Sequence, residues 1–188
     1  MPFGKPKKSA APLDEAQLQE YALKSLGRRM CSEADLRRLL QAKVERSNSN
    51  GDTGAAKVAA VIARLKEYGY LDDTNFAETY TRLRQENEKF GSRRVRQELS
   101  RKGIAQQTVT DTIETQYAEV NEEALARLHL ERKRIRKPEN EKETARVMRR
   151  LVTAGFSTGV IYKILRQWDV PDETLAALEN LEEPSEAE

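Results

Sequence analysis

The side chains of this chain that could take part in chemistry are mostly cationic, and the usual catalytic types are scarce. One cysteine, Cys31, and one histidine, His129, are present in 188 residues. These counts exclude an intrachain disulfide and a thiolate zinc cage, and they argue strongly against Cys/His catalysis. We expect Cys31 to be a half-buried thiol at a helix start and His129 to lie on the charged face of a helix. No phosphate-cradling glycine loop is present, so the sequence predicts a protein that is not an enzyme, with no catalytic residue, no metal site and no cofactor.

Two adjacent carboxylates, Asp72 and Asp73, form the next candidate site. Paired carboxylates can bind a metal ion, but no third acidic or histidine ligand follows at helical spacing. Both precede an amphipathic segment that carries Phe76, Tyr80 and Leu83. Carboxylates at such a position accept hydrogen bonds from the free backbone N–H groups of the first helical turn. We therefore expect both aspartates to cap this helix.

The cations are concentrated in the middle of the chain, although the net charge is only +2. Six cations accompany two carboxylates between Glu88 and Ile104, and six accompany one carboxylate between Arg127 and Lys137. Residues 170–188 carry seven carboxylates and no cation. This asymmetry favours a polyanionic or acidic partner that approaches the basic middle of the molecule. The candidate partner-binding and DNA-binding residues are Arg93, Arg94, Arg96, Arg101, Lys102, Arg132, Lys133, Arg134 and Arg136.

Apolar residues recur at helical spacing along the chain, and no segment alternates with the period of a strand, so the sequence predicts an all-α fold. Gly69 and Gly103 stand where two of these helices end, and glycine adopts the left-handed cap at the lowest steric cost. Trp168 is expected to fill the core rather than stack on a base. The other apolar positions expected to line the helical faces are Leu18, Tyr21, Ala22, Leu26, Leu36, Leu39, Leu40, Val44, Val58, Val61, Ile62, Leu65, Phe76, Tyr80, Leu83, Val95, Leu99, Ile104, Val109, Ile113, Leu125, Leu128, Ile135, Val147, Leu151, Val160, Ile161, Ile164 and Leu165.

The helical pattern repeats at intervals of 59 and then 52 residues. The matching apolar pairs are Leu36 with Leu40, Val95 with Leu99 and Val147 with Leu151. A repeat of this length is typical of stacked helical units that bury their apolar faces against their neighbours. The predicted organisation is a disordered basic N-terminal segment (1–13), three three-helix repeats (14–71, 72–118 and 119–169) with a loop at 47–54 in the first, and an acidic C-terminal tail (170–188).

The composition agrees with a thin helical array. Hydrophobic residues make up 38% of the chain and charged residues 34%, a balance that suits layers with much surface per residue. No apolar run approaches the roughly 20 residues that span a bilayer, and the N-terminal segment lacks the apolar block of a signal peptide. We therefore expect an elongated cytoplasmic protein with no membrane contact.

The ordered series of motifs resembles one known family. Its most specific parts are Gly69-Tyr70-Leu71-Asp72-Asp73 with Phe76-Ala77, the segment from Gly91 to Ile104, and Tyr21-Ala22-Leu23 followed by Ser32 and Leu36. On these residues the chain is similar, over about residues 17–168, to the RecX family of bacterial regulatory proteins, which modulate the RecA recombinase. The segment 47–54 departs from the family, whose members usually have a tighter turn there.

The resemblance implies three tandem three-helix repeats in a curved array. It implies binding along the groove of the RecA filament on single-stranded DNA, with inhibition of ATP hydrolysis and strand exchange. The protein would then be a negative regulator of homologous recombination and DNA repair, within the SOS response. No cofactor is implied, and we expect a monomer.

A different function, direct DNA binding of the helix-turn-helix type, stays open. Three-helix units with an arginine-rich helix have a suitable form, and free DNA would then be the partner. Against this alternative, the basic residues are spread over two units and lack an Asn/Gln-rich face for reading bases, since Gln97, Gln106 and Gln107 are scattered.

Overall fold

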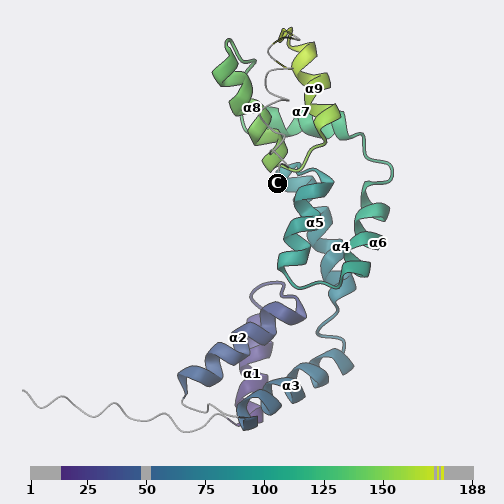
Figure 1. Ribbon diagram of the computed structural model, residues 1–188. Helices are drawn as coiled ribbons and strands as arrows, with labels where there is room; N and C mark the ends of the chain where they lie inside the picture. The colour runs from purple at the N-terminus through teal and green to yellow at the C-terminus, as the bar shows by residue number, and fades with distance from the viewer. Residues whose placement is uncertain (1–13, 48–51, 172, 174, 176–188) are drawn as a thin grey trace, which may run out of the picture. The chain divides into compact units, whose positions relative to one another are not determined.

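The computed structural model describes residues 14–47, 52–171, 173 and 175, and this part of the chain is helical with no strand (Figure 1). The all-α prediction is therefore confirmed. The basic segment predicted at 1–13 lies outside the described residues. The helices are α1 (Glu15–Leu26), α2 (Glu33–Arg46), α3 (Asp52–Glu67), α4 (Asp73–Leu83), the π-helical turn η1 (Arg84–Glu88), α5 (Ser92–Arg101), α6 (Gln106–Tyr117), α7 (Glu122–Arg132), α8 (Glu141–Thr153) and α9 (Thr158–Gln167).

The chain divides into two compact units. Unit 1 contains the residues up to Ala77 together with Ser100–Thr108, and unit 2 contains Glu78–Leu99 together with the chain from Val109 onwards. Helices α4, α5 and α6 contribute residues to both units. None of the helices in the described ranges combines the length and the apolar character that a bilayer crossing requires.

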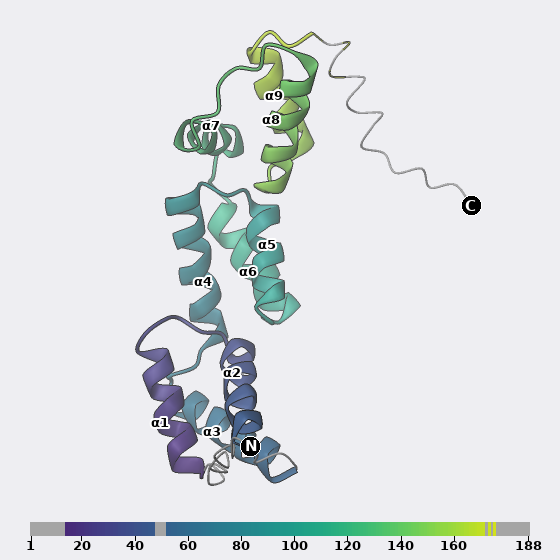
Figure 2. The same cartoon turned by 90° about the vertical axis from the view of Figure 1, so that its left-hand side faces the viewer.

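Unit 1 is organised around the contacts of α3 with both α1 and α2 (Figure 2). Leu18, Leu36 and Leu65 are completely buried in its core. The side chain of Asp14 accepts a hydrogen bond from the backbone of Gln17 in a capping box that starts α1. Buried apolar positions three or four residues apart therefore place one face of each helix on a common core.

The first turn of α2 is capped from two directions. Ser32 Oγ accepts from the Asp35 N–H at 3.1 Å. Asp73 Oδ1 accepts from the Glu33 N–H at 2.8 Å, across 40 residues of sequence. The prediction that Asp73 caps its own helix is therefore wrong, whereas Asp72 Oδ1 does cap α4 by accepting from the backbone N–H groups of Thr74 and Asn75. Sequence spacing could not identify this second helix, because only the fold places its N-terminus beside Asp73.

Two predicted segment limits differ from the structure. Helix α3 begins at Asp52, so the last three residues of the predicted loop 47–54 are helical. Asp and Thr favour helix starts, and a glycine in the first turn is tolerated. At the other end, Val170 and Leu175 are buried in the core of unit 2, so the predicted tail begins with residues that pack.

Unit 2 is built on α9, which packs against both α7 and α8 (Figure 1). Phe156, Leu151 and Ile161 are at most 1% exposed in its core. Trp168 packs against this core while remaining partly exposed, in agreement with its expected structural role. Leu83 and Leu128 were expected on helical core faces but are 38% and 45% exposed.

Each unit contains a hydrogen bond to the carbonyl that precedes a glycine turn, donated by a side-chain hydroxyl in unit 1 and by a backbone N–H in unit 2. In unit 1, Ser32 Oγ donates to the carbonyl of Lys102 at 2.7 Å, just before the turn at Gly103. In unit 2, the Gly91 N–H donates to the carbonyl of Ala154 at 2.9 Å, just before the turn at Gly155. These residues are related by the offsets of 59 and 52 found in the sequence. The apolar repeat therefore coincides with a repeated contact geometry.

The glycine in each turn is required by both conformation and space. Gly103 and Gly155 have φ values of +77° and +91°, a region that L side chains rarely adopt. A Cβ atom on Gly103 would lie 2.5 Å from the Cβ of Ala34, and one on Gly155 would lie 2.2 Å from the backbone N of Arg94. In both units the turn therefore packs directly on the first turn of another helix.

Candidate functional site

A basic groove of about 510 Å3 lies on unit 2. Its lining combines cationic side chains with the apolar side chains of Phe90, Ile135 and Ala154, which we call its floor, and the cations come from three separate segments. The lining residues are Phe90, Arg94, His129, Lys133, Ile135, Arg146, Arg149, Arg150, Thr153 and Ala154. We refer to this site as the basic groove.

Phe90, on the floor of the groove, is positioned by the irregular end of η1. The π-helical turn ends at Lys89, whose left-handed φ of 54° reverses the chain. The Tyr117 hydroxyl then donates to the carbonyl of Phe90 at 2.8 Å. Tyr117 is itself shielded from water, and burial raises the pKa of its hydroxyl far above the usual value, so it stays a neutral donor. A π-helical turn is a common device for positioning residues at functional sites.

Helix α8 supplies three arginines to the groove. Arg146, Arg149 and Arg150 are spaced by three and four residues, so they share one helical face. All three are exposed, and none forms an ion pair with a carboxylate in the part of the chain that the structure describes. Within the described ranges, one side-chain hydrogen bond is formed by these arginines, from Arg149 Nε to the carbonyl of Ala145 at 3.2 Å. These guanidinium groups are therefore available to an external anion.

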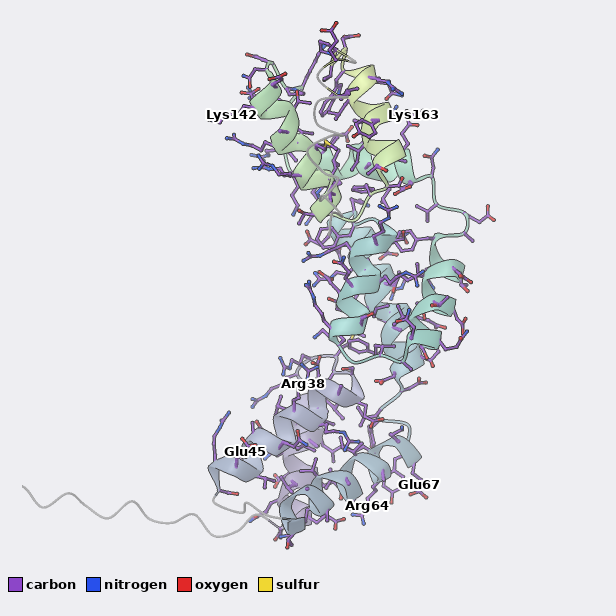
Figure 3. The ribbon with its side chains drawn as sticks, in the orientation of Figure 1. Arg38, Glu45, Arg64, Glu67, Lys142 and Lys163 are labelled. Carbon is purple, nitrogen blue, oxygen red and sulfur yellow. The ribbon has the colours of Figure 1, made fainter. Side chains whose placement is uncertain are left out.

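The two lysines labelled in Figure 3 on α8 and α9 differ in whether they have a carboxylate partner. Lys142, in the first turn of α8, is exposed and has no ion pair within the described ranges. Lys163, on α9, lies 2.5 Å from a carboxylate oxygen of Glu123. The side chain of Glu123 also pairs with Arg127, and the hydrogen bond from Lys163 lowers the pKa of its carboxyl. The α8 cations consequently differ from Arg127 and Lys163 in lacking a carboxylate partner among the described residues.

The other two cations of the groove are paired with carboxylates. Arg94 Nε lies 2.9 Å from Glu98, whose side chain is only 10% exposed. Lys133 Nζ lies 3.0 Å from Glu88, and this hydrogen bond lowers the pKa of the Glu88 carboxyl. These ion pairs fix the two cations in place and offset part of their charge.

Glu98 is the centre of a buried polar network. Arg84 Nε and the Tyr80 hydroxyl each lie 2.9 Å from its Oε2 atom, and Arg94 pairs with its Oε1 atom. Arg84 also donates to the Tyr80 hydroxyl and lies over the Tyr80 ring, 4.9 Å from its centroid. Burial is the main reason why the pKa of Tyr80 is raised. The network connects α4, η1 and α5 and holds Arg94 at the edge of the groove.

His129 lies in the interior, so the prediction that it occupies a charged helix face is wrong. It is 4% exposed and packs between the rings of Phe90 and Phe156, each with its centroid 5.8 Å away. Its Nδ1 atom lies 2.9 Å from the carbonyl of Glu88, and burial lowers the pKa of its imidazole. The buried face of α7 includes Leu125 and His129, four residues apart, which turns Leu128 toward solvent.

The predicted site residues of α5 and its C-terminal turn have divergent environments. Arg93 is exposed without an ion pair among the described residues, whereas Arg96 donates to Thr110 Oγ1 at 3.2 Å. Arg101 and Lys102 belong to unit 1. The Nζ atom of Lys102 lies 2.7 Å from Asp35 Oδ2. Of the predicted residues on α5 and its C-terminal turn, the groove lining includes Arg94.

The predicted residues after α7 are also divided. Arg132 lies 3.7 Å from a carboxylate oxygen of Glu88 and shares this partner with Lys133. Arg134 and Arg136 are exposed, and Arg134 has a left-handed φ of 52° where the chain leaves the helix. Of the nine predicted residues, the groove contains Arg94 and Lys133.

The α8 arginines are the functional candidates that the sequence analysis missed. Arg149 and Arg150 lie between the repeat positions Val147 and Leu151, and neither they nor Arg146 is among the candidates predicted from the sequence. A signal was nevertheless present, because Lys142, Arg146 and Arg149 recur at helical spacing. The carboxylates of this helix, Glu141 and Glu143, are confined to its first turn.

Comparison with known proteins identifies related chains. The sequence model of a family described as "RecX, second three-helix domain" matches residues 72–113. The regulatory protein RecX of Cronobacter sakazakii is 34% identical over 157 residues, which cover 82% of this chain and 93% of that protein. The regulatory protein RecX of Oceanobacillus iheyensis is 27% identical over 150 residues. This match covers 79% of the present chain but only 52% of that longer protein.

A solved structure supports the same fold. The crystal structure of a regulatory protein RecX superposes with a TM-score of 0.64 at 24% sequence identity. The match covers 81% of this chain and 71% of the other. At this identity the similarity concerns the fold, which is all-helical in the residues described for this chain.

Proposed function

This chain belongs to the RecX family of regulatory proteins, and on that premise we propose that it regulates the RecA recombinase by binding its filament on single-stranded DNA. The proposed outcome is inhibition of ATP hydrolysis and strand exchange, hence negative control of recombination and DNA repair, exerted in the cytoplasm by a protein without catalytic activity of its own. The basic groove is the observation that carries this proposal, because a nucleoprotein filament presents phosphates and carboxylates.

The α8 arginines support the proposal more directly than the total charge does. Arg146, Arg149 and Arg150 have no carboxylate partner among the described residues, so binding an external anion breaks no existing ion pair. Arginine also binds phosphate and carboxylate in a bidentate geometry. We therefore assign the main anion contacts to α8, with Arg94 and Lys133 as the other cations of the groove.

We propose that the chain is organised in three repeats, at 14–71, 72–118 and 119–169, in an elongated and curved array. The repeated contact at Ser32 and Gly91 supports this organisation. An array of this kind can touch several subunits of a filament, so that modest contacts add through effective concentration. Small-angle scattering would contradict this proposal if it gave the radius of gyration of a sphere of 188 residues.

The function is tested by titrating the purified protein into a DNA-stimulated RecA ATPase reaction. The test variant is Arg146→Glu/Arg150→Glu. The control variant is Arg28→Glu/Arg29→Glu, which reverses two exposed arginines of unit 1 that also lack an ion pair in the described ranges. Both variants change the net charge equally.

We expect the wild-type protein to lower the ATPase rate and the control to match it. The test variant should need at least about tenfold more protein for half inhibition, because two charge-assisted contacts of about 1 kcal/mol each exceed the 1.4 kcal/mol of a tenfold change. Absence of inhibition by the wild-type protein would refute the function. Equal inhibition by a folded Arg146→Glu/Arg150→Glu variant would remove the groove from the mechanism.

Direct DNA binding of the helix-turn-helix type is the second candidate, and the unpaired α8 arginines support it as well, because they suit the phosphates of bare DNA. The two functions differ in whether RecA is needed for tight binding to DNA. Affinity for an oligonucleotide is measured against salt concentration, with and without RecA. Each phosphate contact adds about 0.9 to the salt slope on duplex DNA and about 0.7 on a single strand. Tight, sequence-selective binding to bare duplex would favour the second candidate.

A further inference from the structure

We propose that the acidic C-terminal segment of this chain, residues 176–188, binds in the basic groove of unit 2 and competes there with external anions. The docking depends only on the groove and the segment. Its regulatory consequence, a lower affinity for the filament, rests on the proposed function.

The groove requires an occupant with two properties. Its α8 side presents Arg146, Arg149 and Arg150, which have no carboxylate partner in the described part of the chain. Its floor contains the apolar side chains of Phe90 and Ile135. A matching ligand therefore carries negative charges beside apolar groups.

The sequence of residues 176–188 has both properties. It contains five glutamates and no lysine or arginine, and two leucines stand among the first of these acids. The leucines are Leu178 and Leu181, and the glutamates are Glu179, Glu182, Glu183, Glu186 and Glu188. A leucine on the floor with neighbouring glutamates at the arginines would satisfy both requirements.

The segment also starts at a suitable point. Leu175 is 3% exposed and belongs to the same hydrophobic core as Ala154, which lines the groove. The segment therefore leaves unit 2 itself. Thirteen extended residues reach at most about 45 Å, whereas the 13 residues of α8 span about 20 Å. The covalent connection thus gives the segment a high effective concentration at the groove, an advantage that an external ligand lacks.

Disulfide trapping in the full chain tests the docking without RecA or DNA. Cys31 is replaced by serine, and cysteines are introduced at Thr153, which lines the groove, and at Leu181. In the matched control the first cysteine is instead at Leu128, which is exposed on α7 and is not part of the groove lining. Crosslinking under mild oxidation is followed by gel mobility. A third protein adds Glu179→Gln, Glu182→Gln and Glu183→Gln to the groove pair.

We expect the groove pair to crosslink about tenfold faster than the control, because docking raises the local concentration of the two thiols. The glutamine substitutions and 1 M salt should remove most of this difference, since at that ionic strength charges are screened beyond about 3 Å. Equal rates for the two pairs, or a fast rate that neither treatment changes, would overturn the proposal.

The RecA assay separates this inference from the proposed function. If docking regulates binding, the glutamine variant with wild-type cysteine content inhibits the RecA ATPase at lower concentration than the wild-type protein. A charge-dependent crosslink in a protein that never inhibits RecA would support the docking and refute the function. Inhibition of RecA by a protein whose groove pair crosslinks no faster than the control would refute the docking and support the proposed function.

Discussion

Replacement of Glu98 by glutamine should destabilise unit 2, because this carboxylate neutralises two arginines in a shielded position. Arg84 Nε and Arg94 Nε each lie 2.9 Å from one of its oxygens, and the Tyr80 hydroxyl donates to it at 2.9 Å. Glutamine has nearly the same shape but offers one acceptor oxygen in place of two and carries no charge. Its amide N–H2 group would face one of the arginines.

The magnitude follows from the contacts that are lost. A hydrogen bond to a charged group contributes roughly 1.5–3 kcal/mol, so the two arginine contacts together amount to about 3–6 kcal/mol. Glutamine keeps one of the acceptors. The side chains of Arg84 and Arg94 are 36% and 29% exposed, so water recovers part of the remaining loss. We therefore expect the free energy of unfolding to fall by about 2–3 kcal/mol.

Urea denaturation followed by tryptophan fluorescence measures this change in the correct part of the molecule, because the only tryptophan, Trp168, packs against the core of unit 2. The expected result is a lower midpoint with an unchanged slope. The matched control is Glu131→Gln, at an exposed position on α7 without an ion pair in the described ranges, which should shift the free energy by less than about 0.5 kcal/mol. Coincident midpoints for the two variants would refute the assigned role of Glu98.

Three further predictions concern stability and can be checked by urea denaturation, followed by tryptophan fluorescence for the two sites in unit 2 and by far-UV circular dichroism for Asp73 in unit 1. Gly155→Ala should lower the free energy of unfolding by more than about 2 kcal/mol, because a Cβ would lie 2.2 Å from a backbone nitrogen at a φ of +91°. The control is Gly159→Ala, which should be neutral or stabilising because a Cβ at this position has nothing within 4 Å. Asp73→Ala should lower the free energy of unfolding by about 1 kcal/mol, because α2 loses its cap. If this decrease is no greater than that of Glu78→Ala, a substitution at an exposed position, the capping role of Asp73 is contradicted. Burial lowers the pKa of His129 below its usual 6.5, so the unfolded chain binds the proton first and stability should fall as the pH drops from 7 to 5.5. His129→Asn should flatten this dependence, and equal pH slopes would show that His129 is not its source.

The helical fold was largely predictable because burial and periodicity coincide. The pairs Leu36 with Leu40 and Val95 with Leu99 are all completely buried, as a shared helical face requires. The misplacement of Leu128 and His129 has a specific cause. A histidine at an apolar position is acceptable when it has a hydrogen-bond partner, and here that partner is the carbonyl of Glu88, 41 residues away. Only the tertiary structure brings the two together, so hydrophobicity alone gave the wrong face of α7.

The candidate site was less predictable, because the sequence counts charges but does not show which of them pair. Arg94 and Lys102 were counted as available cations, yet each lies within 3 Å of a carboxylate oxygen, on Glu98 and Asp35 respectively. The partner of Lys102 is 67 residues distant in sequence. Arg146, by contrast, lies outside the two densest basic blocks and is one of the cations without such a partner. Cation density therefore indicated two of the groove's five lysine and arginine side chains and missed α8, the helix that supplies the other three.

The distinction between paired and unpaired cations also determines how the groove should respond to salt. Arg94 is held by a carboxylate that is only 10% exposed, and an interaction so shielded is weakly screened by dissolved ions. The α8 arginines are exposed, so their attraction to any anion falls steeply as ionic strength rises. Salt should therefore release an anion bound at α8 while leaving the Glu98 network, and with it the position of Arg94, intact. The groove would then lose its ligand at salt concentrations at which unit 2 remains folded, which makes loss of binding a readout of the groove's exposed cations and not of unfolding.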